Sequence, residues 1–358
     1  MRLAQDRAVK NGRAFDIVIE LTHRCNVACR HCYILPGARE LSVREWDRIL
    51  AEMARHGVFV LTVTGGEPTL YPNFFDFMEL TKRHNFAVRL FTNLTTLSEE
   101  DMDRLREANL LAVETTIHAA DAAVHDRFCR SPGAFEKEIA ALKRMREKGF
   151  PLAIKTTWSR CNHKSPQRMF DLAEKLGIYL RASPSMTPRR DMSTDHFDDW
   201  RLSDDELFDL FMEIIRITGT EEKLSSCDSY PLPKDDAHFC GAGLASARID
   251  PSGRMYPCIE IQEVVGDLTA QSFDEIWYNA PMLKELRRLH VTDAKECMAC
   301  ADRKFCFRCP GQAHSEGAGL CGPAQDACRI ARVNRRIFEV LSRDKQATAV
   351  TVRRSNNP

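Results

Sequence analysis

Residues 15–32 read FDIVIELTHRCNVACRHC, and this stretch decides the fold of the chain. Its first part, FDIVIEL, is a short run rich in β-branched residues, as is typical of a buried strand. Its second part places Cys25, Cys29 and Cys32 in the loop after that strand. Three cysteines in a CxxxCxxC pattern can hold three irons of a [4Fe–4S] cube and leave the fourth iron open to another ligand. The stretch therefore predicts a strand that ends at an iron–sulfur site.

A structural zinc site is the alternative interpretation of these cysteines. Tetrahedral zinc needs four ligands, and no fourth cysteine is near them in the sequence. His23 or His31 would have to complete the site. The cysteine spacing favours the cluster.

Strand and helix patterns alternate from about residue 16 to residue 183. Five more strand candidates follow the first, at 58–64, 86–92, 110–117, 151–158 and 178–184. Helical patterns lie between them at 42–57, 73–84, 98–109, 133–149 and 165–177, with Ser42 and Ser98 as N-caps. Repeated βα units of this size predict an α/β fold with a parallel sheet, curved or closed, and helices outside. In such folds the chemistry lies at the C-terminal ends of the strands.

The rest of the chain has a different pattern. Residues 184–237 are polar and rich in turns, so we interpret them as a linker that holds one helix near 203–218. Residues 238–345 have dense cysteines, short strands and a hairpin over IDPSGRMYP (249–257), which predicts a small domain built around metal clusters. We expect the tail, 346–358, to be disordered.

Composition limits the classes of function. The 358 residues include 51 basic and 51 acidic side chains, so no net charge attracts nucleic acid or a membrane surface. No apolar run approaches ~18 residues and the N-terminus lacks an apolar signal segment, so we expect a cytoplasmic protein. In a reducing compartment, 14 cysteines indicate metal or cluster ligation rather than disulfides.

The C-terminal cysteines form a second constellation. Twelve residues, Gly253 and four more residues separate Cys240 from Cys258. The others follow the pattern Cys297-x2-Cys300-x5-Cys306-x2-Cys309, and then come Cys321 and Cys328. A zinc ribbon is the alternative, but its cysteine pairs usually stand ~15–20 residues apart, against the five found here.

A second motif accompanies the first cysteine loop. Gly65-Gly66-Glu67-Pro68 ends the second strand candidate. Together with CxxxCxxC after the first strand, it resembles the radical S-adenosylmethionine (radical SAM) superfamily. The resemblance implies a partial (β/α)6 TIM-like barrel in residues 1–183. It also implies that S-adenosylmethionine chelates the open iron and is split by one electron into methionine and a 5′-deoxyadenosyl radical.

The same resemblance implies roles for single residues. The GGEP motif binds the methionine amino group, with glycines that allow a close approach and Glu67 as acceptor. Asn93 and Thr116 end the third and fourth strands, where the family often has polar groups for the ribose or carboxylate. His118 and Lys155 are further candidates of the same kind.

The C-terminal pattern is similar to the SPASM domain of peptide-modifying radical enzymes, with two residues instead of three between Cys306 and Cys309. The resemblance implies two auxiliary clusters. The ligands of one are Cys297, Cys300, Cys306 and Cys328, and those of the other are Cys240, Cys258 and Cys309. The second cluster lacks a fourth cysteine, so Cys227 or Cys321 closes it or its open iron takes a substrate thiolate. Cys129 and Cys161 are interpreted as ordinary buried thiols.

Relatives of this type mostly oxidise ribosomally made peptides. We therefore expect a peptide maturase that forms a thioether or another cross-link and takes electrons from a flavodoxin- or ferredoxin-like donor. About fifteen residues precede the first strand, so a leader peptide would be bound by a separate protein or by the barrel itself. The alternatives are a tetrapyrrole side-chain enzyme of the haem pathway, a sulfatase-maturing enzyme, and a non-catalytic iron–sulfur or zinc protein.

Overall fold

The computed structural model describes residues 2–37, 39–224, 232 and 234–355, and its centre is one sheet in the order β6-β5-β4-β3-β2-β1-β7-β8-β9. Its first six strands are parallel and confirm the predicted α/β fold with six strands. They are β1 (Asp16–Glu20), β2 (Val60–Thr64), β3 (Ala87–Phe91), β4 (Leu110–Thr116), β5 (Leu152–Thr157) and β6 (Tyr179–Ser183).

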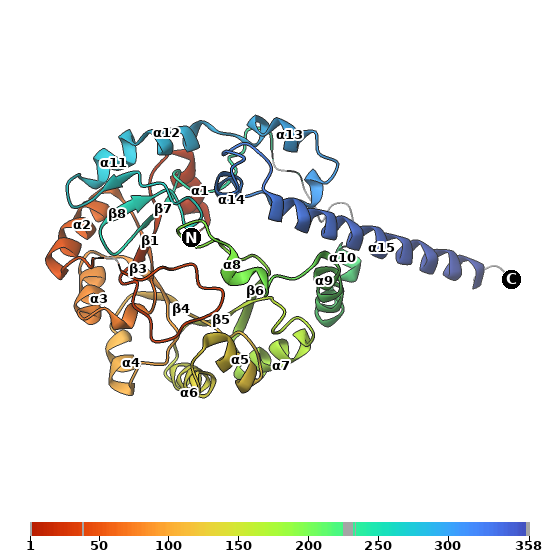
Figure 1. Ribbon diagram of the computed structural model, residues 1–358, viewed down its shortest axis with the longest axis horizontal. Helices are drawn as coiled ribbons and strands as arrows, with labels where there is room; N and C mark the ends of the chain where they lie inside the picture. Colours follow the sequence, from red (N-terminus) through yellow and green to blue (C-terminus); the bar gives the residue numbers. More distant parts are fainter. Residues whose placement is uncertain (1, 38, 225–231, 233, 356–358) are drawn as a thin grey trace.

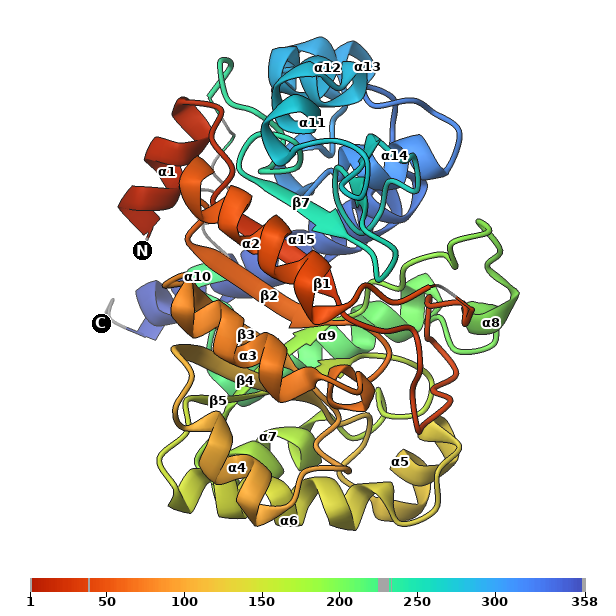
Figure 2. The same cartoon turned by 90° about the vertical axis from the view of Figure 1, so that its left-hand side faces the viewer.

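Helices follow the strands and cover the outside of the sheet, as Figures 1 and 2 show. They are α2 (Val43–His56), α3 (Phe74–Arg83), α4 (Glu99–Leu105), α5 (Ala122–Cys129), α6 (Ala134–Glu147) and α7 (Pro166–Leu176). Ser42 and Ser98 form capping boxes with Glu45 and Asp101, as their positions predicted. Helix α5 was not predicted.

The two faces of the sheet differ in chemistry, because side chains alternate along each strand. On β1, Ile17 and Ile19 are buried in the hydrophobic core, whereas Asp16 and Glu20 lie on the opposite face. Charged groups on β3 to β6 share that second face. The buried Glu114 is contacted there by Arg89 (3.7 Å), Lys155 (3.0 Å) and Arg181 (3.2 Å). The inner face of the partial barrel is therefore polar.

The predicted hairpin forms, and it is joined to the sheet of the barrel. Strands β7 (Ser246–Ile249) and β8 (Arg254–Tyr256) are antiparallel, and β9 (Gly266–Asp267) extends them. Strand β7 also pairs in parallel with β1, so the hairpin continues the barrel sheet at its first strand. An open strand edge is free to accept such a partner, and the sequence does not show which strand will take the place.

The other elements lie around the two ends of the sheet. They are α1 (Arg2–Lys10), α8 (Asp195–Asp198), α9 (Asp204–Thr218), α10 (Glu221–Leu224), α11 (Phe273–Asn279), α12 (Pro281–Arg288), α13 (Lys295–Met298), α14 (Pro310–Ser315), α15 (Gln325–Ser355), and the short 3-10 turns η1 (Pro68–Leu70), η3 (Val291–Asp293) and η4 (Arg303–Phe305). Residues 346–355 of the tail predicted to be disordered continue α15, which projects from the body as Figure 1 shows, and residues 356–358 lie outside the described part of the chain. Within the described residues, every helix is too short or too polar to cross a membrane.

Candidate iron–sulfur site

The loop that carries Cys25, Cys29 and Cys32 is held by the end of α5. The Ala28 N–H donates to the carbonyl of Cys129 (2.9 Å), and the Arg30 N–H donates to the carbonyl of Phe128 (3.1 Å). These two bonds flank Cys29. The backbone of α5 therefore fixes the middle cysteine, a contact that spacing in the sequence does not reveal.

The GGEP turn is bonded to the start of the same loop. The Gly66 N–H donates to the Thr22 carbonyl and the Glu67 N–H to the Arg24 carbonyl, both at 2.8 Å. A Cβ on Gly65 would lie 2.3 Å from the Thr22 oxygen, and one on Gly66 would lie 2.3 Å from the Arg24 oxygen. Both glycines are thus required by the packing of one loop on the other, in addition to any approach to a ligand.

Glu67, which the sequence predicts to be the acceptor for a bound cation, is hydrogen-bonded to neighbouring residues in the structure. Its side chain is 0% exposed and accepts hydrogen bonds from within the chain. The hydroxyls of Thr69 and Thr92 donate at 2.7 Å, and the Asn93 N–H donates to its other oxygen at 2.7 Å. Burial raises the pKa of Glu67, and these donors act against the rise. Glu67 holds the ends of β2 and β3 together beneath the loop.

Asn93 lies beside the first cysteine. Its side-chain amide is 3.9 Å from Cys25 Sγ and donates to the Asn26 side chain at 2.9 Å.

Thr116 ends β4 in register with Lys155 of β5. Burial lowers the pKa of Lys155 to about 8, although its contact with Glu114 favours the charged form.

His118 is placed differently from the other strand-end candidates. It is 2% exposed, and its ring packs against His31 with 4.7 Å between the ring centroids. Burial lowers its pKa well below the usual value, so the ring is neutral. His118 therefore lies behind the cysteine loop, inside the protein.

The three loop thiols are suited to a group that carries positive charge. Burial raises the pKa of Cys25 to about 11, and the charges of Glu67, Cys29 and Cys32 add to the rise. The pKa of Cys29 is raised well above its usual value, first by its hydrogen bond with Cys129 and then by burial. Ionised thiols crowded in this way repel one another until iron neutralises them, so the donor set fits an iron–sulfur cluster.

The C-terminal cysteines fall into two groups in space. In the first group, burial raises the pKa of Cys306 to about 11, and the charges of Cys328, Cys297 and Cys300 raise it further. The Cys306 thiol also lies 3.9 Å from the carbonyl of Ala327, next to Cys328 on α15. The structure therefore brings these four cysteines together.

The second group consists of Cys240, Cys258 and Cys309. Burial raises the pKa of Cys258 to about 12, and the charges of Cys309 and Cys240 act in the same direction. Burial raises the pKa of Cys321, and the charge of Cys297, a member of the first group, adds a smaller contribution. Cys227, the other predicted fourth ligand, lies outside the described residues.

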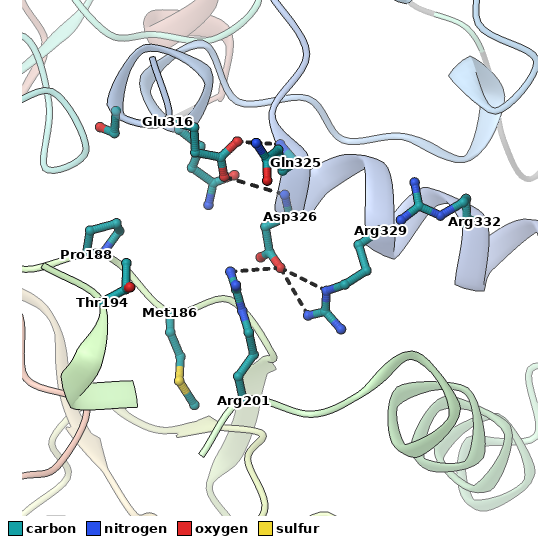
Figure 3. Close-up of a pocket in the computed structure, with 11 residues that line it drawn as sticks. Met186, Pro188, Thr194, Arg201, Glu316, Gln325, Asp326, Arg329 and Arg332 are labelled. Atoms are coloured by element: carbon teal, nitrogen blue, oxygen red, sulfur yellow. Dashed lines mark hydrogen bonds and ion pairs between the residues drawn. The ribbon is translucent and has the colours of Figure 1, made fainter. Parts of the chain in front are cut away.

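A cavity of ≈ 350 Å³ lies between the segment after the barrel and helices α14 and α15. Figure 3 shows Arg201 and Arg329 directed at Asp326, and the nitrogen–oxygen distances are 3.1 and 3.0 Å. Cys309 is the N-cap residue of α14, and Cys328 lies on α15 beside Arg329. Helices α14 and α15, which contribute to the lining, therefore also position cysteines of both C-terminal groups, although the described residues that line the cavity include no cysteine.

The segment after the barrel connects the N-terminal and C-terminal cysteine sites. Thr187 donates to Oε1 of Glu260 at 2.8 Å, and the Glu260 β-carbon and Cys258 Sγ both lie against Gly311. A few residues further, Arg190 contacts Glu20 and His23 at the end of β1. This segment thus contacts residues close to both cysteine sites.

Comparisons with known proteins agree with this geometry. Residues 19–159 match the "Radical SAM superfamily", and residues 240–309 match an "Iron-sulfur cluster-binding domain". The mycofactocin maturase MftC of Mycobacterium ulcerans is 30% identical over 85% of this chain and 85% of that protein. The AdoMet-dependent heme synthase of Methanosarcina barkeri is 28% identical over 84% of this chain and 92% of that protein.

The fold also matches a solved structure. Streptococcus suis SuiB bound to its precursor peptide SuiA has a TM-score of 0.70 and 16% identity over 91% of this chain and 79% of that chain. At this identity the match concerns the fold. It covers both the barrel and the C-terminal region.

Proposed function

This chain belongs to the radical SAM superfamily and carries an iron–sulfur cluster-binding domain, and from that premise we propose that it oxidatively modifies a peptide as the maturase of a ribosomally synthesised precursor. When bound, S-adenosylmethionine and the reduced primary cluster supply a 5′-deoxyadenosyl radical that removes a hydrogen atom from the substrate. Cys25, Cys29 and Cys32 are the residues that would hold this cluster. The GGEP turn, Asn93 and Thr116 would face the cofactor at the strand ends.

The C-terminal cysteines would hold two auxiliary clusters. Cys297, Cys300, Cys306 and Cys328 give one complete set of four thiolates. Cys240, Cys258 and Cys309 give the second set, whose fourth ligand is open to a thiol of the substrate or of the chain. An external flavodoxin- or ferredoxin-like protein would deliver electrons.

The cavity between the barrel and the C-terminal region is the observation that carries the peptide proposal. Its volume of ≈ 350 Å³ lies in the range of ligand pockets, roughly 300–1,000 Å³, and suits a few residues of an extended chain. Met186 and Pro188 offer apolar contacts to a bound peptide, and Arg332 offers a cation to an acidic group of that peptide. A maturase relative and the precursor peptide bound in SuiB support this choice of substrate class.

The haem pathway is the second candidate, because a heme synthase matches over nearly its whole length. One experiment separates the two. The reduced, reconstituted chain is incubated anaerobically with S-adenosylmethionine and either the short peptides encoded next to its gene or a haem-pathway tetrapyrrole. We expect a mass decrease in a peptide that accompanies 5′-deoxyadenosine. Turnover of the tetrapyrrole alone would overturn the peptide assignment.

A further inference from the structure

Cys129 places a fourth thiol next to the cysteine loop. It is 2% exposed and ends α5. Its Sγ, the Sγ of Cys29 and a ring nitrogen of His118 all lie within 4.8 Å of one another, a group that does not include Cys25 or Cys32. A cube spreads its ligands over several corners, whereas a single ion gathers them at one point. The compactness of this group is that of a mononuclear site.

The donor set matches the chemistry of zinc. Thiolates bind Zn²⁺ at about 2.3 Å and imidazole nitrogens at about 2.0–2.1 Å, so small side-chain movements bring all three atoms onto one ion. His118 Nδ1 is buried and has no hydrogen-bond partner among the described residues. A divalent ion would also cancel the charge of two buried thiolates, which are costly without compensation.

The ring of His125 contacts Cys129. The backbone N–H of His118 donates to Nδ1 of His125 at 3.2 Å. Because Nδ1 accepts this bond, a neutral His125 ring carries its hydrogen on Nε2. That nitrogen lies 3.3 Å from Cys129 Sγ and 3.6 Å from Oε1 of Glu138, so both groups are within reach of its hydrogen. Outer hydrogen bonds of this kind fix metal ligands in place. Cys129 is therefore surrounded as a ligand would be, unlike an ordinary core thiol.

We propose that Cys29, His118 and Cys129 form a mononuclear site that binds Zn²⁺ when the primary cluster is absent. Solvent or His31, whose ring packs on His118, completes the coordination. Because Cys29 is also a ligand of the primary cluster in the proposed function, the ion and that cluster exclude each other. Zinc bound here blocks assembly of the primary cluster and leaves the C-terminal clusters unaffected.

The first test uses the full chain with Cys25→Ala and Cys32→Ala, reconstituted so that iron occupies the C-terminal cysteines. Cobalt(II) serves as the spectroscopic probe. We expect about one equivalent of tetrahedral Co²⁺ with thiolate charge-transfer absorption, displaced by Zn²⁺. Adding Cys129→Ala removes this signal, whereas adding Cys161→Ala, a matched cysteine near the His118 carbonyl, preserves it.

The controls separate this proposal from the proposed function. Iron content and circular dichroism show that each variant is folded and holds its C-terminal clusters. An undiminished cobalt signal after Cys129→Ala overturns the site, as does the absence of a signal in the folded double variant. Neither result depends on S-adenosylmethionine cleavage or on peptide turnover.

A second test uses the unaltered cysteine loop. The reconstituted chain is freed of its primary cluster only, with iron kept on the C-terminal cysteines, then given one equivalent of Zn²⁺ and reconstituted again, and iron is counted. We expect a loss of about four irons per chain in the wild type, the content of one cube. Cys129→Ala should load the primary cluster with or without zinc, and equal inhibition of both proteins contradicts the proposal.

Discussion

The guanidinium of Arg190 lies 2.8 Å from Nε2 of His23, two residues before the first cysteine of the loop. It also forms an ion pair with Glu20, which is 0% exposed and lies 3.3 Å from Arg248 of β7. Burial would raise the pKa of Glu20, but the hydrogen bond with His23 and the charges of Arg248 and Arg190 lower it to about 2. One buried carboxylate therefore joins β1, β7 and the segment after the barrel.

Arg190→Gln should separate cofactor cleavage from substrate modification. The variant loosens the segment that forms one wall of the cavity, while Arg248 still pairs with Glu20. We expect 5′-deoxyadenosine to form at a similar rate and modified peptide to fall about tenfold, as a loss of ~1.4 kcal/mol in positioning would cause. Arg189→Gln is the matched control, because Arg189 pairs with the exposed Asp195. An equal ratio of the two products in all three proteins contradicts the prediction.

Replacing Cys25, Cys29 and Cys32 together by alanine should abolish cleavage of S-adenosylmethionine. The C-terminal cysteines remain, so the loss of iron should be about four per chain. Chromatography of 5′-deoxyadenosine and iron analysis measure the two effects. If the triple variant still cleaves the cofactor, the primary site has been assigned to the wrong residues.

Gly66→Ala should destabilise the cysteine loop. The new Cβ would lie 2.3 Å from the Arg24 carbonyl, and backbone cannot yield as a flexible side chain can. We expect a loss of stability of about 3 kcal/mol and poor retention of the primary cluster. Gly241→Ala is the control, because its nearest neighbour would be 3.4 Å away. Similar melting temperatures for the two variants would show that the contact is unimportant.

Glu138 should make stability depend on pH. Burial raises its pKa to about 7, while the hydrogen bond and charge of His125 oppose the rise. The native state therefore holds a proton that the unfolded chain releases above about pH 4.5. This stabilisation is complete below that pH and is lost as the pH rises through about 7, for a total of about 3 kcal/mol.

The measurement is the unfolding midpoint between pH 5 and pH 8. Glu138→Gln stays neutral in both states, so the pH dependence should shrink. Glu136→Gln lies on the same helix but is exposed, and it should behave as the wild type. A Glu138→Gln variant with the full pH dependence would assign the effect to other groups.

The sequence predicted the parts of the molecule that depend on local patterns. Ser42 and Ser98 cap their helices, and the six strands lie where β-branched runs occur. It did not predict that the Glu67 carboxylate accepts hydrogen bonds from Thr92 and Asn93, because those donors follow the next strand. The sequence likewise does not place Cys129 beside Cys29, as the structure does. Its position beside Cys29 depends on how α5 returns to the loop, and spacing along the chain carries no such information.

The pairing of β7 with β1 has a consequence for biosynthesis. A ribosome releases β1 long before Ser246–Ile249, and until then the outer edge of β1 has unpaired backbone groups. Such an edge can pair with other nascent chains. Translation that stalls after β6 would therefore leave a nearly complete barrel that aggregates. The need for chaperones during expression should therefore depend on how quickly the ribosome synthesises the last third of the chain.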